Sequence, residues 1–389
     1  MARTADYVIV GGGIVGCSIA YHLARRGAKN IVVLEQGSLG SGSTSKAAGG
    51  VRAQFANEVT IRMALYSQEV YRHFQDEFGL SADYREIGYL FLLTTKEELK
   101  GFRANIKLQN SLGVPTQPLT PAKIKQMVPA VKVDDLVGGS FCPTDGTAGP
   151  AEALQGFVRR SRKMGVEFCE ESPVVAIDVE RGRVRAVRTS SETIQTPVVV
   201  NAAGPWAAPV GRLVGVDLPV RPLKRHVWIT EAFDEIPGPT PMVIDFHTGF
   251  YFRKELDSVL WSGGDMLERW NFDTEVEWDC LQDSVEKAVK RVPALANARV
   301  RSGWAGLREV TPDHLPIIGP VPQPEGFICA VGFSGHGFMH APATGRLVSE
   351  LLLDSKTWLN INRLRYERFL EGAALESKEL SVGSRAEEE

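Results

Sequence analysis

The stretch YVIVGGGIVGCSIAYHLARRGAKNIVVLE, residues 7–35, decides the fold of this 389-residue chain. Four residues of strand character lead into a turn with Gly11, Gly13 and Gly16, and the residues after the turn have the apolar spacing of a helix that packs on a sheet. A second β-branched run then ends in Glu35. This order of strand, glycine turn, helix and strand predicts a Rossmann-type α/β unit.

The glycine turn also predicts a ligand. Glycines let backbone N–H groups approach a pyrophosphate at the helix N-terminus, where the helix dipole favours negative charge. A carboxylate at the end of the second strand can accept hydrogen bonds from a ribose diol. We therefore expect a bound dinucleotide rather than a purely structural turn. The expected contacts in this stretch are Gly11, Gly13, Ile14, Val15, Gly16, Glu35 and Gln36.

A second loop of small residues follows at once, GSLGSGSTSKAAGGVRAQF, residues 37–55. An enzyme that binds a nicotinamide cofactor normally continues from the acidic residue into another helix. Here glycine and alanine would let the backbone approach a planar ring, and serine and threonine hydroxyls can donate to phosphate oxygens. The loop favours FAD, with a flexible loop as the alternative. Its expected contacts are Ser43, Thr44, Ser45, Lys46, Gly49, Gly50 and Val51.

Two later segments are expected to return to the nucleotide site. TPVVVNAAGPWA, residues 196–207, is a buried-strand run that stops in small residues, and residues 326–353 read as strand, glycine-rich turn and helix. Backbone donors in that turn could reach the O2 edge of a flavin, and the helix dipole would stabilise a reduced flavin. We interpret His336 as a structural or cofactor-side residue. The expected contacts are Val174, Val175, Ala202, Ala203, Gly204, Trp206, Gly332, Phe333, Ser334, Gly335, His336, Gly337, Phe338 and Met339.

The composition favours a small molecule as the binding partner over nucleic acid or a membrane surface. With 44 basic and 47 acidic side chains the net charge is −3, so no overall field would gather nucleic acid or an anionic membrane surface. The five cysteines are far apart and lack a metal-ligand spacing, which favours buried thiols, a reducing compartment and no metal site. Neither a targeting segment nor a membrane span is apparent, so a cytoplasmic location is expected.

The chain resembles the FAD-dependent amine oxidoreductases of the D-amino acid oxidase type, above all sarcosine oxidase and glycine oxidase, and also dimethylglycine dehydrogenase. The resemblance covers nearly the whole chain, and five pieces in the same order make it specific. The pieces are VIVGGGIVG with VVLE, GSTSKAAGGVR, VVVNAAGPWA, GLREVTPDHLPIIGP and AVGFSGHGF.

The resemblance implies an α/β protein, α+β overall, with two discontinuous domains. A Rossmann-type FAD-binding domain would take residues 1–85, 146–220 and 318–389, and a substrate-binding domain would take residues 86–145 and 221–317. The second domain would be an antiparallel sheet that roofs the flavin.

The resemblance also implies the chemistry. The chain would oxidise the C–N bond of a small amino acid or N-methyl amino acid, such as sarcosine or glycine, by hydride transfer to flavin N5. The imine product would be hydrolysed, and O2 would reoxidise the flavin with release of H2O2. Arg308 and Tyr251 resemble the arginine and tyrosine that hold the substrate carboxylate in glycine oxidase and D-amino acid oxidase, and Arg52 is a second candidate.

Departures from the family leave parts of this reading open. Gly306 and Lys46 stand where sarcosine oxidase and dimethylglycine dehydrogenase attach their flavin, so non-covalent FAD is expected. Tyr251 replaces the lysine that favours reaction with oxygen in monomeric sarcosine oxidase, and Met339 replaces the lysine near the substrate carboxylate there. The alternatives are therefore the catalytic subunit of a dye- or quinone-linked dehydrogenase for proline or a D-amino acid, with a protein or quinone electron acceptor, and a non-catalytic flavoprotein assembly factor. The oligomeric state is also open.

Overall fold

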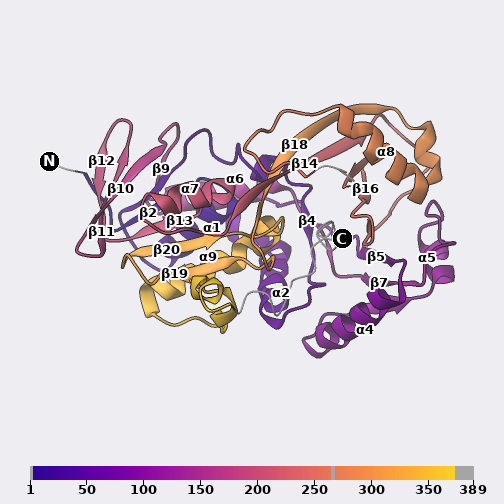
Figure 1. Cartoon of the computed structure of the whole chain (residues 1–389), viewed down its shortest axis with the longest axis horizontal. Coiled ribbons are helices and arrows are strands. Elements are labelled where there is room, and N and C mark those ends of the chain that lie inside the picture. Colours follow the sequence, from indigo (N-terminus) through magenta and orange to yellow (C-terminus); the bar gives the residue numbers. More distant parts are fainter. Residues whose placement is uncertain (1–2, 264–267, 373–389) are drawn as a thin grey trace.

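The computed structural model describes residues 3–263 and 268–372. One half of the molecule is built on a six-stranded sheet in the order β19-β20-β13-β2-β3-β9. The labelled strands of this sheet lie on the left in Figure 1. All neighbouring strands in it are parallel except β19 and β20. The strands are β2 (Tyr7–Val10), β3 (Ile31–Leu34), β9 (Glu167–Cys169), β13 (Val199–Asn201), β19 (Ile317–Pro320) and β20 (Phe327–Val331).

Alternating side chains of this sheet enter two different cores. Ile9, Val33 and Val200 pack on the helical side, whereas Val8 and Val32 pack on the opposite side. This period of two is what a strand covered on both faces requires. The helical side contains α1 (Ile14–Arg25), α2 (Glu58–Arg72), α3 (Phe74–Phe78), α6 (Pro150–Lys163) and α9 (Gly337–Asp354).

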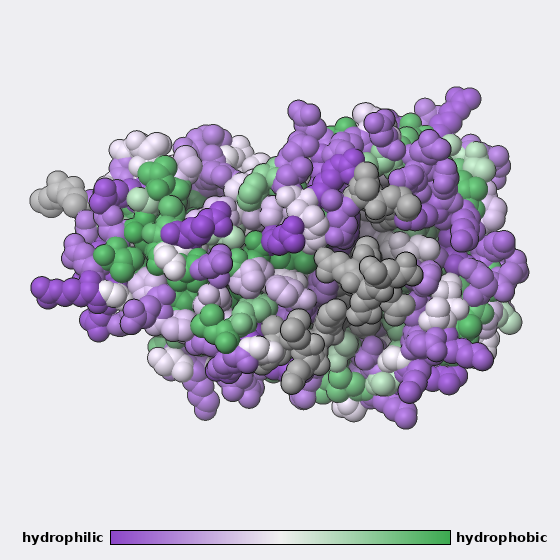
Figure 2. Space-filling view, in the orientation of Figure 1, coloured by the Kyte–Doolittle hydropathy of each residue, from purple (hydrophilic) through white to green (hydrophobic). Residues whose placement is uncertain are grey.

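A four-stranded sheet and a short helix cover the other side. The turn at Arg181-Gly182 joins β10 to β11 with φ of +50° and +75°. The elements are β1 (Arg3–Thr4), β10 (Val174–Glu180), β11 (Arg183–Thr189), β12 (Thr193–Gln195) and α7 (Ala207–Arg212). Most of the face shown in Figure 2 is hydrophilic, and its hydrophobic side chains form small patches, more of them on the side of these two sheets.

The second large sheet has eight strands in the order β18-β14-β17-β16-β15-β5-β7-β6. Its strands are β5 (Tyr89–Leu93), β6 (Gln117–Leu119), β7 (Gly138–Cys142), β14 (Arg221–Thr230), β15 (Met242–Asp245), β16 (Tyr251–Glu255), β17 (Ser258–Ser262) and β18 (Val300–Val310). The helices α4 (Lys96–Ser111), α5 (Pro121–Met127) and α8 (Asp279–Arg291) lie on the same side of the molecule (Figure 1).

The eight-stranded sheet differs from the expected antiparallel sheet in one pairing. β5 and β15 run parallel, with Met242 opposite Tyr89 and Ile244 opposite Phe91. Parallel neighbours need a long connection, and the chain between these two strands passes through the six-stranded sheet before it returns. The mixed α/β fold class is confirmed, and the domain boundaries remain a prediction.

The two faces of this sheet have different neighbours. Trp228, Trp261, Phe252 and Val243 lie in the apolar core that includes Ala288 of α8. The residues adjacent to them in sequence face the other way, toward the glycine-rich segments. The sheet therefore presents a separate row of side chains to the nucleotide-binding half of the molecule.

Candidate active site

A cavity of about 730 Å³ lies between the ends of β2, β13 and β20 and the inner face of the eight-stranded sheet. This volume is within the usual range for ligand and cofactor sites. Four glycine-rich segments line it: residues 10–15, 35–50, 202–206 and 335–339. The structure thus brings together segments that lie far apart in the sequence.

The first turn requires glycine at two positions. Gly11 has φ of +113°, and a side chain there would clash with the carbonyl oxygen of Ala202. A side chain on Gly16 would clash with the carbonyl oxygen of Gly11. Because no Cβ intervenes, β2, β13 and the start of α1 meet closely at the cavity wall, which is the cradle a pyrophosphate needs.

Glu35 is held at the cavity edge by two backbone donors. The N–H of Gly12 donates to Oε2 at 2.7 Å, and the N–H of Gly37 donates to Oε1 at 3.0 Å. Each carboxylate oxygen keeps a further lone pair for a ligand. The position fits the ribose role that the sequence predicts.

We predict that Glu35→Ala weakens FAD retention by on the order of a few kcal/mol, because a hydrogen-bonded carboxylate contacting the ribose is lost. The measurement is the flavin content of the protein after extensive dialysis. Glu170→Ala, which removes an exposed carboxylate that accepts from Leu39 N–H, is the matched control. Unchanged flavin content in Glu35→Ala would count against this placement.

The hydroxyl groups of the second loop have partners within the protein. Ser43 Oγ donates to the carbonyl of Leu307 at 2.7 Å, and Ser45 Oγ donates to the carbonyl of Ser41 at 3.1 Å. Thr44 Oγ1 instead accepts from the N–H of Ile14 at 3.0 Å. The sequence suggests all three as phosphate donors, but in the structure Ser43 fastens the loop to β18 and Ser45 bonds within the loop.

The third and fourth segments reach the cavity through the starts of η2 (Gly204–Trp206) and α9. Gly337, Phe338 and Met339 form the first turn of α9. Helix N-termini favour negative charge, so the starts of α1 and α9 give one cavity two such sites. This arrangement fits FAD, which has an anionic diphosphate and a ring system that becomes electron-rich on reduction.

Several predicted contact residues do not line the cavity. Val175 is 53% exposed, because side chains alternate along β10 and Val174 takes the inward position. Gly332 and Ser334 lie behind the wall, where their N–H groups donate to Glu309. The predicted residues outside the lining are Gly16, Ser45, Val51, Val175, Gly332, Phe333 and Ser334.

All three predicted substrate residues line the cavity. Arg308 lies against the turn that precedes α9, since a methyl group on Gly335 would lie 3.0 Å from its Nε. Tyr251 lies opposite Ser262 and Ile244 on the inner face of the sheet. Arg52 is only 2% exposed, and its own contacts already hold it.

The contacts of Arg52 involve a neutral histidine. Its Nη2 lies 3.0 Å from His336 Nε2, its Nη1 donates to the carbonyl of Gln54, and its guanidinium carbon lies 4.0 Å from the centre of the Phe55 ring. Burial, and then the charge of Arg52, hold the pKa of His336 well below its usual value. His336 therefore accepts a hydrogen bond from Arg52, which fits the structural alternative of the two roles, structural or cofactor-side, that the sequence predicts.

Some cavity residues escape the sequence analysis. Tyr89 lies beside Gly50. Arg225, on β14, lies opposite Gly306 of β18. Phe272 stacks on Trp206 with ring centres 5.6 Å apart. Tyr89 could have been found as the residue with a polar group in the otherwise apolar run YLFLL. Arg225 could not, because its inward direction depends on pairing with β18.

Two further observations concern the residues that the structure describes. Among residues 3–263 and 268–372 we find no helix with the length and hydrophobicity of a membrane span. The same ranges contain no cluster of three or more His, Cys, Asp or Glu side chains placed to hold a metal ion. All five cysteines are free thiols, and four of them are buried.

Comparison with known proteins finds relatives that are named as oxidases or dehydrogenases of small amino acids. L-proline dehydrogenase from P. horikoshii superposes with a TM-score of 0.89 at 34% identity, covering 96% of this chain and 99% of that one. Glycine oxidase from Geobacillus kaustophilus has a TM-score of 0.83 at 26% identity, covering 94% and 99%. Human mitochondrial sarcosine dehydrogenase is 30% identical over 95% of this chain.

Two relatives are longer than this chain. The chain spans 42% of human sarcosine dehydrogenase, and less than half of the rat dimethylglycine dehydrogenase that it also matches. The family model described as DAO, FAD dependent oxidoreductase, matches residues 6–351. The cofactor is FAD, and the chain belongs to the DAO family of FAD-dependent oxidoreductases.

Proposed function

We propose that this enzyme oxidises the C–N bond of a small amino acid or N-methyl amino acid, of the sarcosine or glycine type. The observation that carries the proposal is that Arg308 and Tyr251, from two strands of one sheet, line the cavity that the glycine-rich segments form. A cation and a phenol would then face the ring end of the cofactor. This pair suits an amine that carries a carboxylate.

The proposed roles are positional. Arg308 would bind the substrate carboxylate through its guanidinium fork, and Tyr251 would add a hydrogen bond to the same group. Val227, Met242 and Ile244 line the same side of the cavity and suit a small apolar substituent. Holding both ends of the substrate would keep its reacting C–H in one orientation.

FAD supplies the hydride acceptor of this reaction when it is bound. The protein would bind the amine in its neutral form, exclude water during the transfer, and release an imine that hydrolyses in water. We assign no acid or base to a side chain. His336 is neutral and already accepts from Arg52, which leaves it in a structural role.

A dehydrogenase is the second candidate. The similarity to L-proline dehydrogenase over nearly the full length of both chains favours it, and the apolar side chains beside Tyr251 also suit a pyrrolidine ring. Electrons would then pass to a dye, a quinone or a partner protein rather than to O2. A non-catalytic assembly factor is the third reading, and it predicts a flavin that no amine reduces.

Anaerobic bleaching of the flavin tests the proposal. Holoprotein is mixed with sarcosine, glycine, L-proline and D-amino acids, and the loss of flavin absorbance is followed. Bleaching by one of these compounds supports the proposed reaction, and no bleaching by any of them contradicts it. Admitting air afterwards separates the first two readings, because an oxidase produces H2O2 steadily and a dehydrogenase needs an added acceptor.

We predict that acid precipitation releases the flavin into the supernatant. Lys46 and Gly306, which stand where relatives attach their flavin, are neighbours here, since a methyl group on Gly306 would lie 2.6 Å from Lys46 Cβ. Neither side chain provides the thiol or imidazole of those linkages. Flavin absorbance that stays with the pellet would show a covalent bond to another residue.

A further inference from the structure

Glu309 is a carboxylic acid in the wall of the FAD cavity, and the sequence does not single it out. It follows Arg308 on β18 and lines the cavity. A methyl group on Gly337 would lie 3.6 Å from its Oε1, and one on Gly204 would lie 4.0 Å from its Oε2. The carboxyl group therefore lies between the start of α9 and η2, where the third and fourth glycine-rich segments meet.

Backbone donors fix one side of this carboxyl group. The N–H of Gly332 donates to Oε2 at 2.9 Å, and the N–H of Phe333 also donates to the carboxyl. The N–H of Ser334 donates to the main-chain carbonyl of Glu309 at 2.9 Å, so the backbone there is held as well. Oε2 accepts from Gly332, and Oε1 lies toward Gly337, which lines the cavity.

Burial raises the pKa of Glu309 to about 7, and the hydrogen bonds from Gly332 and Phe333 oppose this rise. The acid therefore changes charge near neutral pH. Arg308 precedes it on β18, and the neutral His336 lies just before α9. The other ionisable residues of the cavity wall are Glu35, Lys46, Arg52, Tyr89, Arg225 and Tyr251.

Filling the cavity changes the balance between the two forms of the acid. A cofactor in the cavity would keep water away from the carboxyl group, and a carboxylate that is kept from water without gaining a donor is penalised. The diphosphate of FAD is itself anionic and adds repulsion. The neutral acid avoids both costs and offers an O–H donor.

We propose that Glu309 couples FAD binding to pH through one proton, the neutral acid binding the cofactor and the carboxylate weakening it. The proposal needs only the FAD site, and it holds whatever the substrate is. The sign follows from linkage. A group whose proton affinity rises on binding makes binding strongest below its free pKa, and this advantage is lost as pH rises.

The expected size follows from the same linkage. If only the neutral form binds, the dissociation constant for FAD is multiplied by 1 + 10^(pH − pKa), where the pKa is that of Glu309 in the protein without FAD. With a pKa of about 7, FAD binding weakens by up to about 30-fold between about pH 5.5 and about pH 8.5. We expect a loss of about tenfold or more.

The experiment uses holoprotein diluted to a series of concentrations at each pH, with released FAD measured by its fluorescence at equilibrium. Wild-type protein should release more FAD as pH rises. Glu309→Gln, which resembles the neutral acid, should bind with little dependence on pH. Glu309→Ala is the second variant, and it should bind more weakly but with an equally flat profile. Glu325→Gln, which removes an exposed carboxylate that pairs with Arg183, should behave as wild type.

Two outcomes would overturn the proposal. One is a wild-type affinity that does not change over this pH range. The other is an equal pH dependence in wild type and in both Glu309 variants. The second outcome would assign the proton to another group, such as Asp145, whose pKa burial raises to about 6 but which does not line the cavity.

Discussion

Arg308→Met is expected to lower the rate of flavin reduction by the best amino acid substrate more than about tenfold. The variant keeps an unbranched apolar stem but loses the charged fork that would bind the carboxylate. Truncating one partner of a buried charge pair costs roughly 2–5 kcal/mol, and about 1.4 kcal/mol corresponds to a factor of ten. The measurement is anaerobic stopped-flow reduction of the bound flavin.

Three controls define what this loss means. An amine without a carboxylate should lose much less rate in Arg308→Met, because it never uses the fork. Arg221→Met removes an exposed arginine of the neighbouring strand β14 and should leave both rates unchanged. Flavin absorbance and far-UV circular dichroism should match wild type. Equal losses for both amines, or no loss, would return Arg308 to a structural role and leave Arg52 as the arginine to test.

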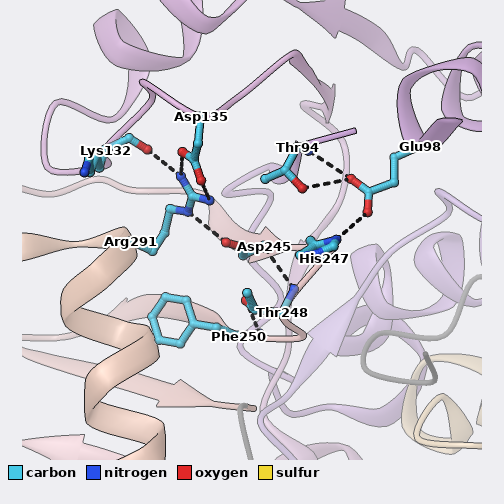
Figure 3. A network of polar contacts seen from close by, with 9 residues as sticks. All are labelled: Thr94, Glu98, Lys132, Asp135, Asp245, His247, Thr248, Phe250 and Arg291. Carbon is cyan, nitrogen blue, oxygen red and sulfur yellow. Dashed lines mark hydrogen bonds and ion pairs between the residues drawn. The ribbon is translucent and has the colours of Figure 1, made fainter. Parts of the chain in front are cut away.

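Arg291→Met is expected to lower the free energy of unfolding by about 3–5 kcal/mol, the usual cost of removing one partner from a buried ion pair. Arg291 Nε donates to Asp245 Oδ2 at 2.8 Å, and these residues are 5% and 2% exposed (Figure 3). Its Nη1 and Nη2 also donate to Asp135. Without the guanidinium, a buried carboxylate at the end of β15 has lost its charge partner.

Denaturant unfolding of the holoprotein, followed by circular dichroism, measures this effect. Arg62→Met is the matched control, since Arg62 pairs with Glu58 on the surface of α2 at 2.7 Å with 42% and 57% exposure. Exposed pairs contribute about 0–1 kcal/mol. The double variant Asp245→Asn with Arg291→Met should lose less than the sum of its single changes. A loss in Arg291→Met no larger than in Arg62→Met would contradict the structural role of this network.

The polar contacts in Figure 3 also connect the eight-stranded sheet to neighbouring helices. Arg291 comes from α8, Asp245 ends β15 and Asp135 belongs to the connection before β7. Nearby, Glu98 of α4 accepts from the N–H and the hydroxyl of Thr94 and lies 3.2 Å from His247 Nδ1. The Arg291–Asp245 ion pair joins α8 to β15, the strand that carries the cavity residue Ile244, and the contact of Glu98 with His247 joins α4 to the turn after that strand.

The sequence by itself determined the nucleotide-binding half of the protein. Its evidence is local: a strand, a glycine turn, a helix and a second strand ending in Glu35 all fall within residues 7–35. Where a side chain would clash, as at Gly11 against Ala202, the residue must be glycine, and that glycine is visible in the sequence. For this reason the fold class and the cofactor could be predicted without coordinates.

Only the tertiary structure decided which other side chains meet that cofactor. Arg225 and Gly306 face the cavity because β14 and β18 pair in that register, and a shift of one residue would turn both away. Glu309 acquires its raised pKa only where the turn after β20 encloses it. Register and burial arise between segments distant in the chain, so no local pattern in the sequence records them.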